Sequence, residues 1–167
     1  CRQFQTDRKR AGRAIGTVWT DLSVLRASLN WGRKSKLIPA APFIWLPAQP
    51  APRERHLIRS EAESLIGGAH ADHIRLFIRL SLGTAGRATA LLELEWARVD
   101  FDRRVVDLRT AEANKTKRRA IVPINATLVA ALREAKKGAL TPYVIEWAGK
   151  RLKTVKRAFA RAAQRAG

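Results

Sequence analysis

The 167-residue sequence predicts an α+β protein, mainly helical, with one small three-stranded antiparallel sheet. Several segments repeat apolar residues every three or four positions, as helices do, and after Trp96 the pattern changes to the alternation typical of strands. A proline-rich stretch at 39–55 divides the chain. We therefore expect a helical segment, a linker and a larger mixed domain.

One amphipathic helix is expected before the linker. From Thr17, which can cap a helix, apolar residues recur at helical spacing: Trp19, Leu22, Leu25 and Leu29. Gly32 lies near the expected end. In the linker, prolines 39, 42, 47, 50 and 52 exclude a regular helix. The linker also contains the apolar run 43–46 (Phe-Ile-Trp-Leu), so we expect it to pack against a neighbouring surface.

Three helices are expected next. Ser60 and Glu63 have the spacing of a capping box, which predicts a helix to about Ile66. Apolar spacing predicts a second helix from His73 to about Leu82. The sequence Gly-Thr-Ala-Gly at 83–86 breaks it, and a third helix is expected over 87–96.

The sheet is expected from residue 98 onward. Residues 98–109 alternate around a tight turn at Asp102–Arg103, and residues 119–124 form a third strand in which Pro123 favours an edge position. Asn125 can cap the following helix. A short strand and turn over 143–150 and a last helix over 152–167 complete the chain.

The charge of the chain indicates a polyanionic partner. Thirty-three Lys and Arg against 14 Asp and Glu give a net charge of +19, for which nucleic acid is the usual partner. A membrane surface is the competing partner, but no apolar run approaches the roughly 20 residues of a membrane helix, and no signal peptide is recognisable. The single cysteine, Cys1, excludes a disulfide within the chain, and with three histidines it has no zinc-ligand spacing. No metal or cofactor is expected.

Basic residues form two clusters in the sequence. In the last helix Arg157, Arg161 and Arg165 repeat every four residues and so line one side, and Lys153 extends the row. The second cluster lies in the turn before the third strand: Lys115, Lys117, Arg118 and Arg119. Either set binds phosphates or is a solvated surface, and the residues themselves leave both interpretations open.

Arg87 follows a glycine-containing turn at the start of the expected 87–96 helix. A cation there faces the positive end of the helix dipole, where a carboxylate would be more favourable. Arg87 is therefore either a solvated side chain or one retained to bind an anion.

These segments resemble the tyrosine recombinases, the phage-integrase family. The family's first catalytic box is matched in spacing by Thr84, Arg87, Leu91, Leu92, Trp96, Val99 and Asp100. Lys115 precedes Pro123 by eight residues, as the catalytic lysine of the family's hairpin does. Residues 16–42 resemble the last helix of the family's core-binding domain and the start of its linker. The resemblance implies a core-binding part at 1–38, a linker at 39–55 and the first part of a catalytic domain at 56–167.

The resemblance implies site-specific DNA recombination by metal-free strand cleavage, through a 3′-phosphotyrosine intermediate. Arg87 would stabilise the transition-state charge and Lys115 would protonate the leaving 5′-oxygen. Lys117, Arg118 and Arg119 would hold backbone phosphates, with a solvated turn as the alternative. The implied partner is double-stranded DNA, bound by a tetramer of the full-length protein. The implied location is the cytoplasm, on nucleoid or phage DNA.

The sequence also departs from the family pattern. No His-x-x-Arg follows Arg119, and Tyr143, the single tyrosine, precedes the basic helix, so we expect a packing role for it. Ala90 stands where the family commonly has an acidic residue. We therefore expect a partial chain that does not cleave DNA by itself. Two alternatives are a non-catalytic DNA-binding remnant of a truncated integrase and a basic RNA-binding protein, although an RNA-binding aromatic pattern is not visible.

Overall fold

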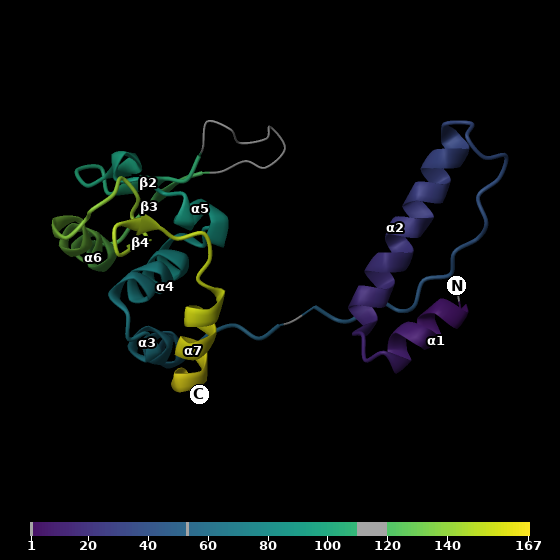
Figure 1. Ribbon diagram of the computed structural model, residues 1–167, viewed down its shortest axis with the longest axis horizontal. Helices are drawn as coiled ribbons and strands as arrows, with labels where there is room; N and C mark the ends of the chain where they lie inside the picture. Colours follow the sequence, from purple (N-terminus) through teal and green to yellow (C-terminus); the bar gives the residue numbers. More distant parts are fainter. Residues whose placement is uncertain (1, 53, 110–119) are drawn as a thin grey trace. The chain divides into compact units, whose positions relative to one another are not determined.

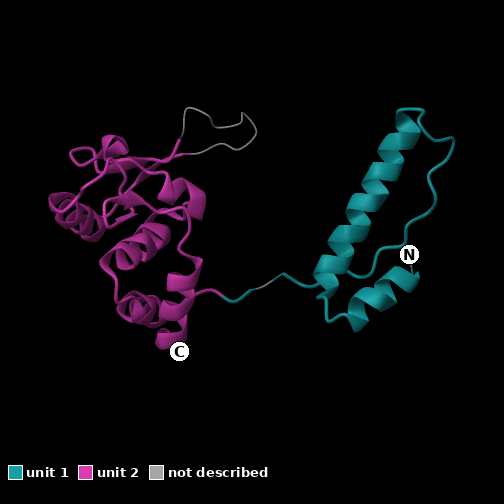
Figure 2. Cartoon of the chain, viewed as in Figure 1, with its two compact units in different colours: residues 1–55 teal, residues 56–167 magenta. Residues whose placement is uncertain are grey.

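The computed structural model describes residues 2–52, 54–109 and 120–167. In it the chain forms two compact units, residues 1–55 and 56–167 (Figure 2). The first unit is helical. The second is mainly helical with a small antiparallel sheet, which confirms the predicted α+β class.

The first unit consists of two helices and an extended segment. Helix α1 (Arg2–Arg10) packs against α2 (Ile15–Lys34), and the Arg8 guanidinium forms an ion pair with Asp21, 2.6 Å away. After α2 the chain returns alongside this helix in an extended form (Figure 1). Ile44 of the extended segment packs into a small core with Val18 and Leu22 of α2.

The predicted packing of the run 43–46 is therefore confirmed for Ile44 and Leu46 but wrong for Phe43 and Trp45. Phe43 is 86% exposed and Trp45 is 52% exposed. Successive side chains of an extended chain point to opposite sides, so burying Ile44 turns both aromatic rings outward. The predicted start of α2 at Thr17 is also wrong. The helix begins at Ile15 after Ala14, which makes no side-chain capping bond.

The second unit begins with α3 (Arg59–Gly68), α4 (Asp72–Thr84) and the short α5 (Ala88–Leu92). A 3₁₀ turn, Trp96–Arg98, leads into the sheet. The strands are β1 (Val99–Asp100), β2 (Val105–Asp107) and β3 (Ile121–Pro123), in the order β1-β2-β3 and antiparallel. Pro123 thus lies in an edge strand, and the tight turn lies between β1 and β2, as the sequence predicts.

The remaining elements are α6 (Ala126–Lys137), the hairpin of β4 (Glu146–Trp147) and β5 (Lys150–Arg151), and α7 (Lys156–Ala166). The Asn125 side chain accepts a hydrogen bond from the Leu128 N–H, 2.9 Å away, which confirms the predicted cap of α6. Helix α4 is central to the core, with Ile78 and Leu80 almost fully buried. Helix α7 packs on α3 so closely that a Cβ on Gly68 would lie 2.5 Å from the Ala162 carbonyl oxygen.

The predicted bounds of α3 and α5 are wrong. The cap of α3 lies two residues earlier than predicted, at Ile58. The Glu61 carboxylate accepts a hydrogen bond from the Ile58 N–H, 3.0 Å away, so Ser60 and Glu63 do not form the capping box. The helix expected over 87–96 ends at Leu92. Beyond it, Leu94 and Trp96 exchange backbone hydrogen bonds with the segment 142–144 instead of continuing the helix.

Candidate functional site

The turn between α4 and α5 places Arg87 at the molecular surface. Helix α4 ends at Thr84, and Ala85 adopts a left-handed conformation with φ of 50°. The buried Thr84 hydroxyl donates to the Leu80 carbonyl oxygen at 2.6 Å and accepts from the Gly86 N–H at 3.1 Å. These two bonds hold the turn in one conformation, and Arg87 follows as the residue that precedes α5.

Glycine at position 86 lets the turn pack closely on its neighbours. A Cβ there would lie 2.7 Å from Leu91 Cδ2 and 3.0 Å from Leu108 Cδ1. The turn thus packs against both α5 and the chain just beyond β2. The sequence predicted a helix break at this glycine-containing stretch but not this close contact.

Arg87 lines a hollow of about 280 Å³. Its walls come from the α4–α5 turn, from α5 and from the chain on either side of residues 110–119: Thr84, Ala85, Gly86, Arg87, Ala90, Leu108, Ala120 and Val122. Among these residues Arg87 alone is charged, and its side chain is exposed. An exposed guanidinium beside a small hollow without a carboxylate in its described walls suits an anion, because its planar fork can donate to two oxygens.

The helix dipole at Arg87 is smaller than the sequence predicted. The predicted helix over 87–96 has ten residues, whereas α5 contains five. A helix of little more than one turn has a small dipole, so the cost of placing a cation at its start is small. The case for an anion at Arg87 therefore depends on the hollow and on the exposure of the side chain.

The basic turn cluster falls on residues outside the described part of the chain. Lys115, Lys117, Arg118 and Arg119 belong to 110–119, so their structure stays a prediction. The structure describes the residues on either side of this segment, Arg109 before it and Ala120 after it. Ala120 lines the Arg87 hollow.

The arginine row of the last helix is present, but it is shorter than the sequence predicted. Arg157, Arg161 and Arg165 all lie exposed on α7. Lys153 does not continue the row, because α7 begins only at Lys156 and Lys153 lies in the preceding turn.

The members of the row differ in their contacts. Arg165 donates a hydrogen bond to the carbonyl oxygen of Gly68, the last residue of α3, 3.3 Å away. A cation there also favours the negative end of the α3 dipole, so Arg165 has a structural role. Arg161 and Arg165 line a hollow of about 200 Å³ together with His70, a residue that the sequence analysis did not select and that no local pattern marks.

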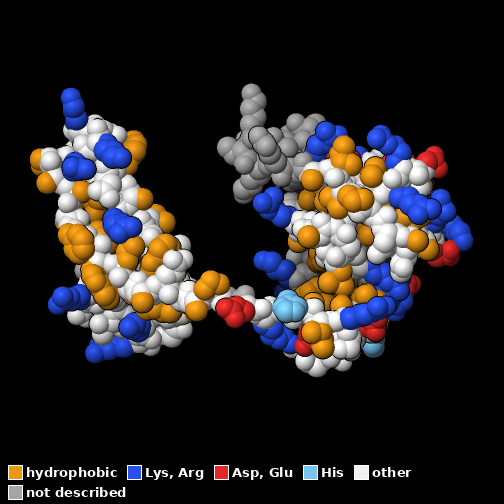
Figure 3. All heavy atoms as spheres, turned by 180° about the vertical axis from the view of Figure 1, so that it is seen from behind, with side chains coloured by type: hydrophobic (Ala, Val, Ile, Leu, Met, Phe, Trp, Pro, Cys, Tyr) orange, Lys and Arg blue, Asp and Glu red, His pale blue; other side chains and the backbone are white. Residues whose placement is uncertain are grey.

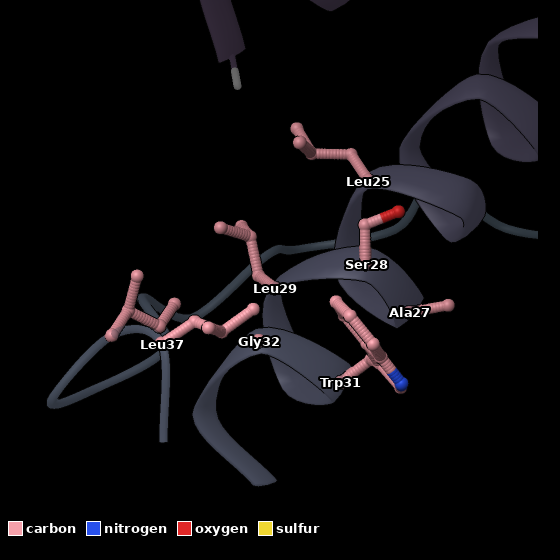
Figure 4. A pocket seen from close by; sticks show the side chains of 8 residues that line it. Leu25, Ala27, Ser28, Leu29, Trp31, Gly32 and Leu37 are labelled. Atoms are coloured by element: carbon pink, nitrogen blue, oxygen red, sulfur yellow. The ribbon is translucent and has the colours of Figure 1, made fainter. Parts of the chain in front are cut away.

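Charge alone does not locate a site on this protein. Lys and Arg side chains are spread over the visible face of both units (Figure 3). A hollow of about 620 Å³ lies on the first unit, larger than the one at Arg87. Figure 4 shows Leu25, Leu29, Trp31 and Leu37 projecting around it from α2 and the turn after α2. Because none of its described lining residues is charged, this hollow does not suit an anion.

Tyr143 occupies a packed position. It forms an isolated β-bridge with Glu95, and its half-buried ring lies beneath the Arg151 guanidinium, 5.0 Å from the ring centroid. Tyr143 is not among the residues that line the Arg87 hollow.

Two other classes of site have no candidate among the described residues. No helix among them is long and apolar enough to cross a membrane. In the same residues, no three His, Cys, Asp or Glu side chains are grouped so that they could hold a metal ion.

The family of the chain is shown by a match to the second unit. The model of the phage integrase family matches residues 55–167. The chain therefore belongs to the phage integrase family, the tyrosine recombinases that its motifs resemble. The integrase of Salmonella phage P22 is 29% identical over 122 residues, which are 72% of this chain and 31% of that protein.

Solved structures show the same fold. A lambda integrase tetramer bound to a Holliday junction is 18% identical, with a TM-score of 0.74, and the match covers 97% of this chain and 50% of that one. The Tn1549 transposon integrase in complex with circular intermediate DNA is 20% identical, with a TM-score of 0.71, covering 96% and 61%. The chain thus spans about a third of the phage P22 integrase and between half and two thirds of these two structures.

Proposed function

We propose that the chain is a DNA-binding part of a site-specific recombinase, and that the Arg87 hollow receives the phosphodiester at which a strand is cut. The observation that carries this proposal is the exposed Arg87 guanidinium beside a hollow whose walls include Leu108 and Ala120, close to both ends of the segment that contains Lys115. Membership of the phage integrase family and the DNA-bound integrases of the same fold support it.

The two units would belong to different domains of the recombinase. Residues 1–38 would be the C-terminal part of the core-binding domain, 39–55 the linker and 56–167 the N-terminal part of the catalytic domain. The family match starts at residue 55, and the boundary between the compact units lies between Arg55 and His56, which supports the last of these assignments.

In the whole protein the reaction would be a transfer of a phosphoryl group between oxygens. A tyrosine oxygen attacks the phosphorus and forms a phosphotyrosine ester, while the bond from phosphorus to the 5′-oxygen breaks. Arg87 stabilises the extra negative charge of the transition state through a fixed pair of N–H donors. Lys115 gives its proton to the leaving 5′-oxygen, which an arginine cannot do at neutral pH.

Affinity would come from phosphates outside the cleavage site. The proposed contacts are the row on α7, the lysine before it and the basic turn: Arg157, Arg161, Arg165, Lys153, Lys117, Arg118 and Arg119. Such contacts orient the protein on a duplex without reading its sequence. The full-length protein would act as a tetramer on double-stranded DNA in the cytoplasm, on nucleoid or phage DNA.

The 167-residue chain would bind DNA without cleaving it. Its single tyrosine is Tyr143, which is packed beneath Arg151 and lies outside the Arg87 hollow. No other residue of the chain can form a phosphotyrosine.

Titration of a fluorescent duplex with the purified chain tests the binding function. We expect the logarithm of the affinity to fall linearly with the logarithm of the salt concentration, with a slope of about −0.9 for each phosphate contacted. Failure to bind the duplex at low salt, or a stronger preference for RNA, would contradict the proposal. A nicked duplex that traps covalent intermediates should give no protein–DNA adduct, and an adduct would contradict the proposed role of Tyr143.

A further inference from the structure

Arg98 joins two separate segments of the second unit through one side chain. It is half-buried at the end of the 3₁₀ turn before β1. Its Nη1 donates to the carbonyl oxygen of Arg109, 2.7 Å away, and its Nη2 donates to the carbonyl oxygen of Glu93. Glu93 terminates α5, and Arg109 lies just beyond β2.

The N–H of Arg109 is held as well. It donates to Asp107 Oδ1 at 2.9 Å, and the Arg109 side chain forms an ion pair with the same carboxylate at 2.7 Å. Both backbone polar groups of Arg109 therefore bond to side chains at a point where a strand would bond to its neighbour. One residue earlier, the Leu108 N–H donates to the Ala120 carbonyl oxygen, 3.1 Å away. Three hydrogen bonds thus hold the chain at the end of β2: two at the backbone of Arg109 and one at the Leu108 N–H.

The two segments that Arg98 joins are those that build the Arg87 hollow. Helix α5 follows Arg87 directly and contributes Ala90 to the walls, and the chain beyond β2 contributes Leu108. Arg98 itself is not among the lining residues. Its side chain would act on the site only through the backbone of its two partners.

We propose that Arg98 is a positioning residue that ties the end of α5 to the end of β2 and so sets where the chain leaves the sheet relative to Arg87. This inference rests on the proposed function, because it gives the Arg87 hollow its significance. A lysine would not substitute, because a single ammonium cannot present the two divergent N–H donors that reach Glu93 and Arg109 together.

Hydrogen exchange of the Leu108 amide tests the physical part of this proposal without DNA. In Arg98→Met, which keeps the stem and removes the donors, we expect Leu108 to exchange at least about tenfold faster because the end of β2 opens more often. The amide of Leu80 in the core should be unchanged. Arg103→Met, which removes an exposed arginine from the β1–β2 turn, is the matched control and should leave both amides unchanged. Unchanged exchange at Leu108 in Arg98→Met would overturn the proposal.

A double-mutant cycle in DNA affinity tests whether the position of the chain beyond β2 affects DNA binding. If Arg98 sets where the chain beyond β2 leaves the sheet, the severalfold loss expected for Lys115→Ala should shrink below about twofold in the Arg98→Met background, whereas the loss for Arg157→Ala should be the same in both backgrounds. A purely structural role would alter both pairs alike.

Two further outcomes separate the proposals. If the unsubstituted chain binds no DNA, the proposed function fails. If it binds and Lys115→Ala costs the same affinity in both backgrounds, the proposed function stands and the role of Arg98 is overturned. Should Arg98→Met fail to fold, as judged by circular dichroism, Arg98→Lys replaces it, with the same loss of coupling expected.

Discussion

Arg87 and Ala120 line the same hollow, although Arg87 precedes α5 and Ala120 precedes β3. Ala120 also accepts the hydrogen bond from Leu108 that closes the described part of the β2–β3 ladder. A phosphate bound at Arg87 would therefore lie beside both the α4–α5 turn and the start of β3.

Removing the Arg87 guanidinium should cost one phosphate contact. We expect Arg87→Ala to reduce the salt slope of duplex binding by about one unit, whereas Arg87→Lys should keep most of the slope because it keeps the charge. Fluorescence anisotropy at several salt concentrations measures this. The control is Arg59→Ala, since Arg59 is paired with Glu63 on the exposed start of α3. An equal loss for both alanine variants would show that Arg87 has no special contact.

Neutralising Arg157 and Arg161 of the α7 row should weaken DNA binding without loss of stability. For the double variant Arg157→Gln and Arg161→Gln we expect the salt slope to fall by about two units. Arg165→Gln should in addition lower the free energy of unfolding, by about 0.3–1 kcal/mol, because Arg165 bonds to the end of α3. Urea unfolding and duplex titration on the same samples separate the two effects. A row that affects stability alone would be structural.

A side chain at position 86 should strain the packing of the turn before Arg87. Gly86→Ala places a methyl group 2.7 Å from Leu91 Cδ2, so we expect a destabilisation of about 1–3 kcal/mol from overpacking. The matched control is Gly67→Ala in α3, where a Cβ meets no atom within 4 Å. It should stabilise the protein by about 0.5 kcal/mol, because alanine loses less entropy than glycine in a helix. Thermal unfolding compares them, and similar melting temperatures would contradict the close packing.

The ion pair at the end of β2 should produce a pH dependence. The hydrogen bond from the Arg109 side chain is the main cause that lowers the pKa of Asp107 from its usual 3.8. A lowered carboxyl pKa contributes stability that is complete above the unfolded value and is lost as the pH falls through the folded value. Unfolding free energies measured from neutral pH to below 3.8 should therefore fall less steeply for Asp107→Asn. Parallel curves would mean that the pair contributes nothing to stability.

The sequence predicted the order of elements well because most signals were local. Asn125 before an apolar repeat and Pro123 in a strand need only neighbouring residues to be understood. The end of α5 could not be predicted in this way. It depends on Leu94 and Trp96 bonding to residues 142–144, which is a tertiary contact that outcompetes continuation of the helix.

The candidate site was predicted in part for the same reason. Arg87 was selected from its motif, and the structure places it at a hollow. The contributions of Leu108, Ala120 and His70 carry no local signal, since each depends on segments that meet only in the fold. The role of Arg98 was not predicted, because the sequence is rich in arginine and the two carbonyl partners of Arg98 are known only from the structure.

A crystal structure of the chain bound to duplex DNA tests the central claim most directly. We predict a phosphate in the Arg87 hollow, with a non-bridging oxygen within about 3 Å of the guanidinium and Lys115 Nζ within reach of the 5′-oxygen of the same phosphodiester. A duplex bound on another face, with the Arg87 hollow turned to solvent, would contradict the account.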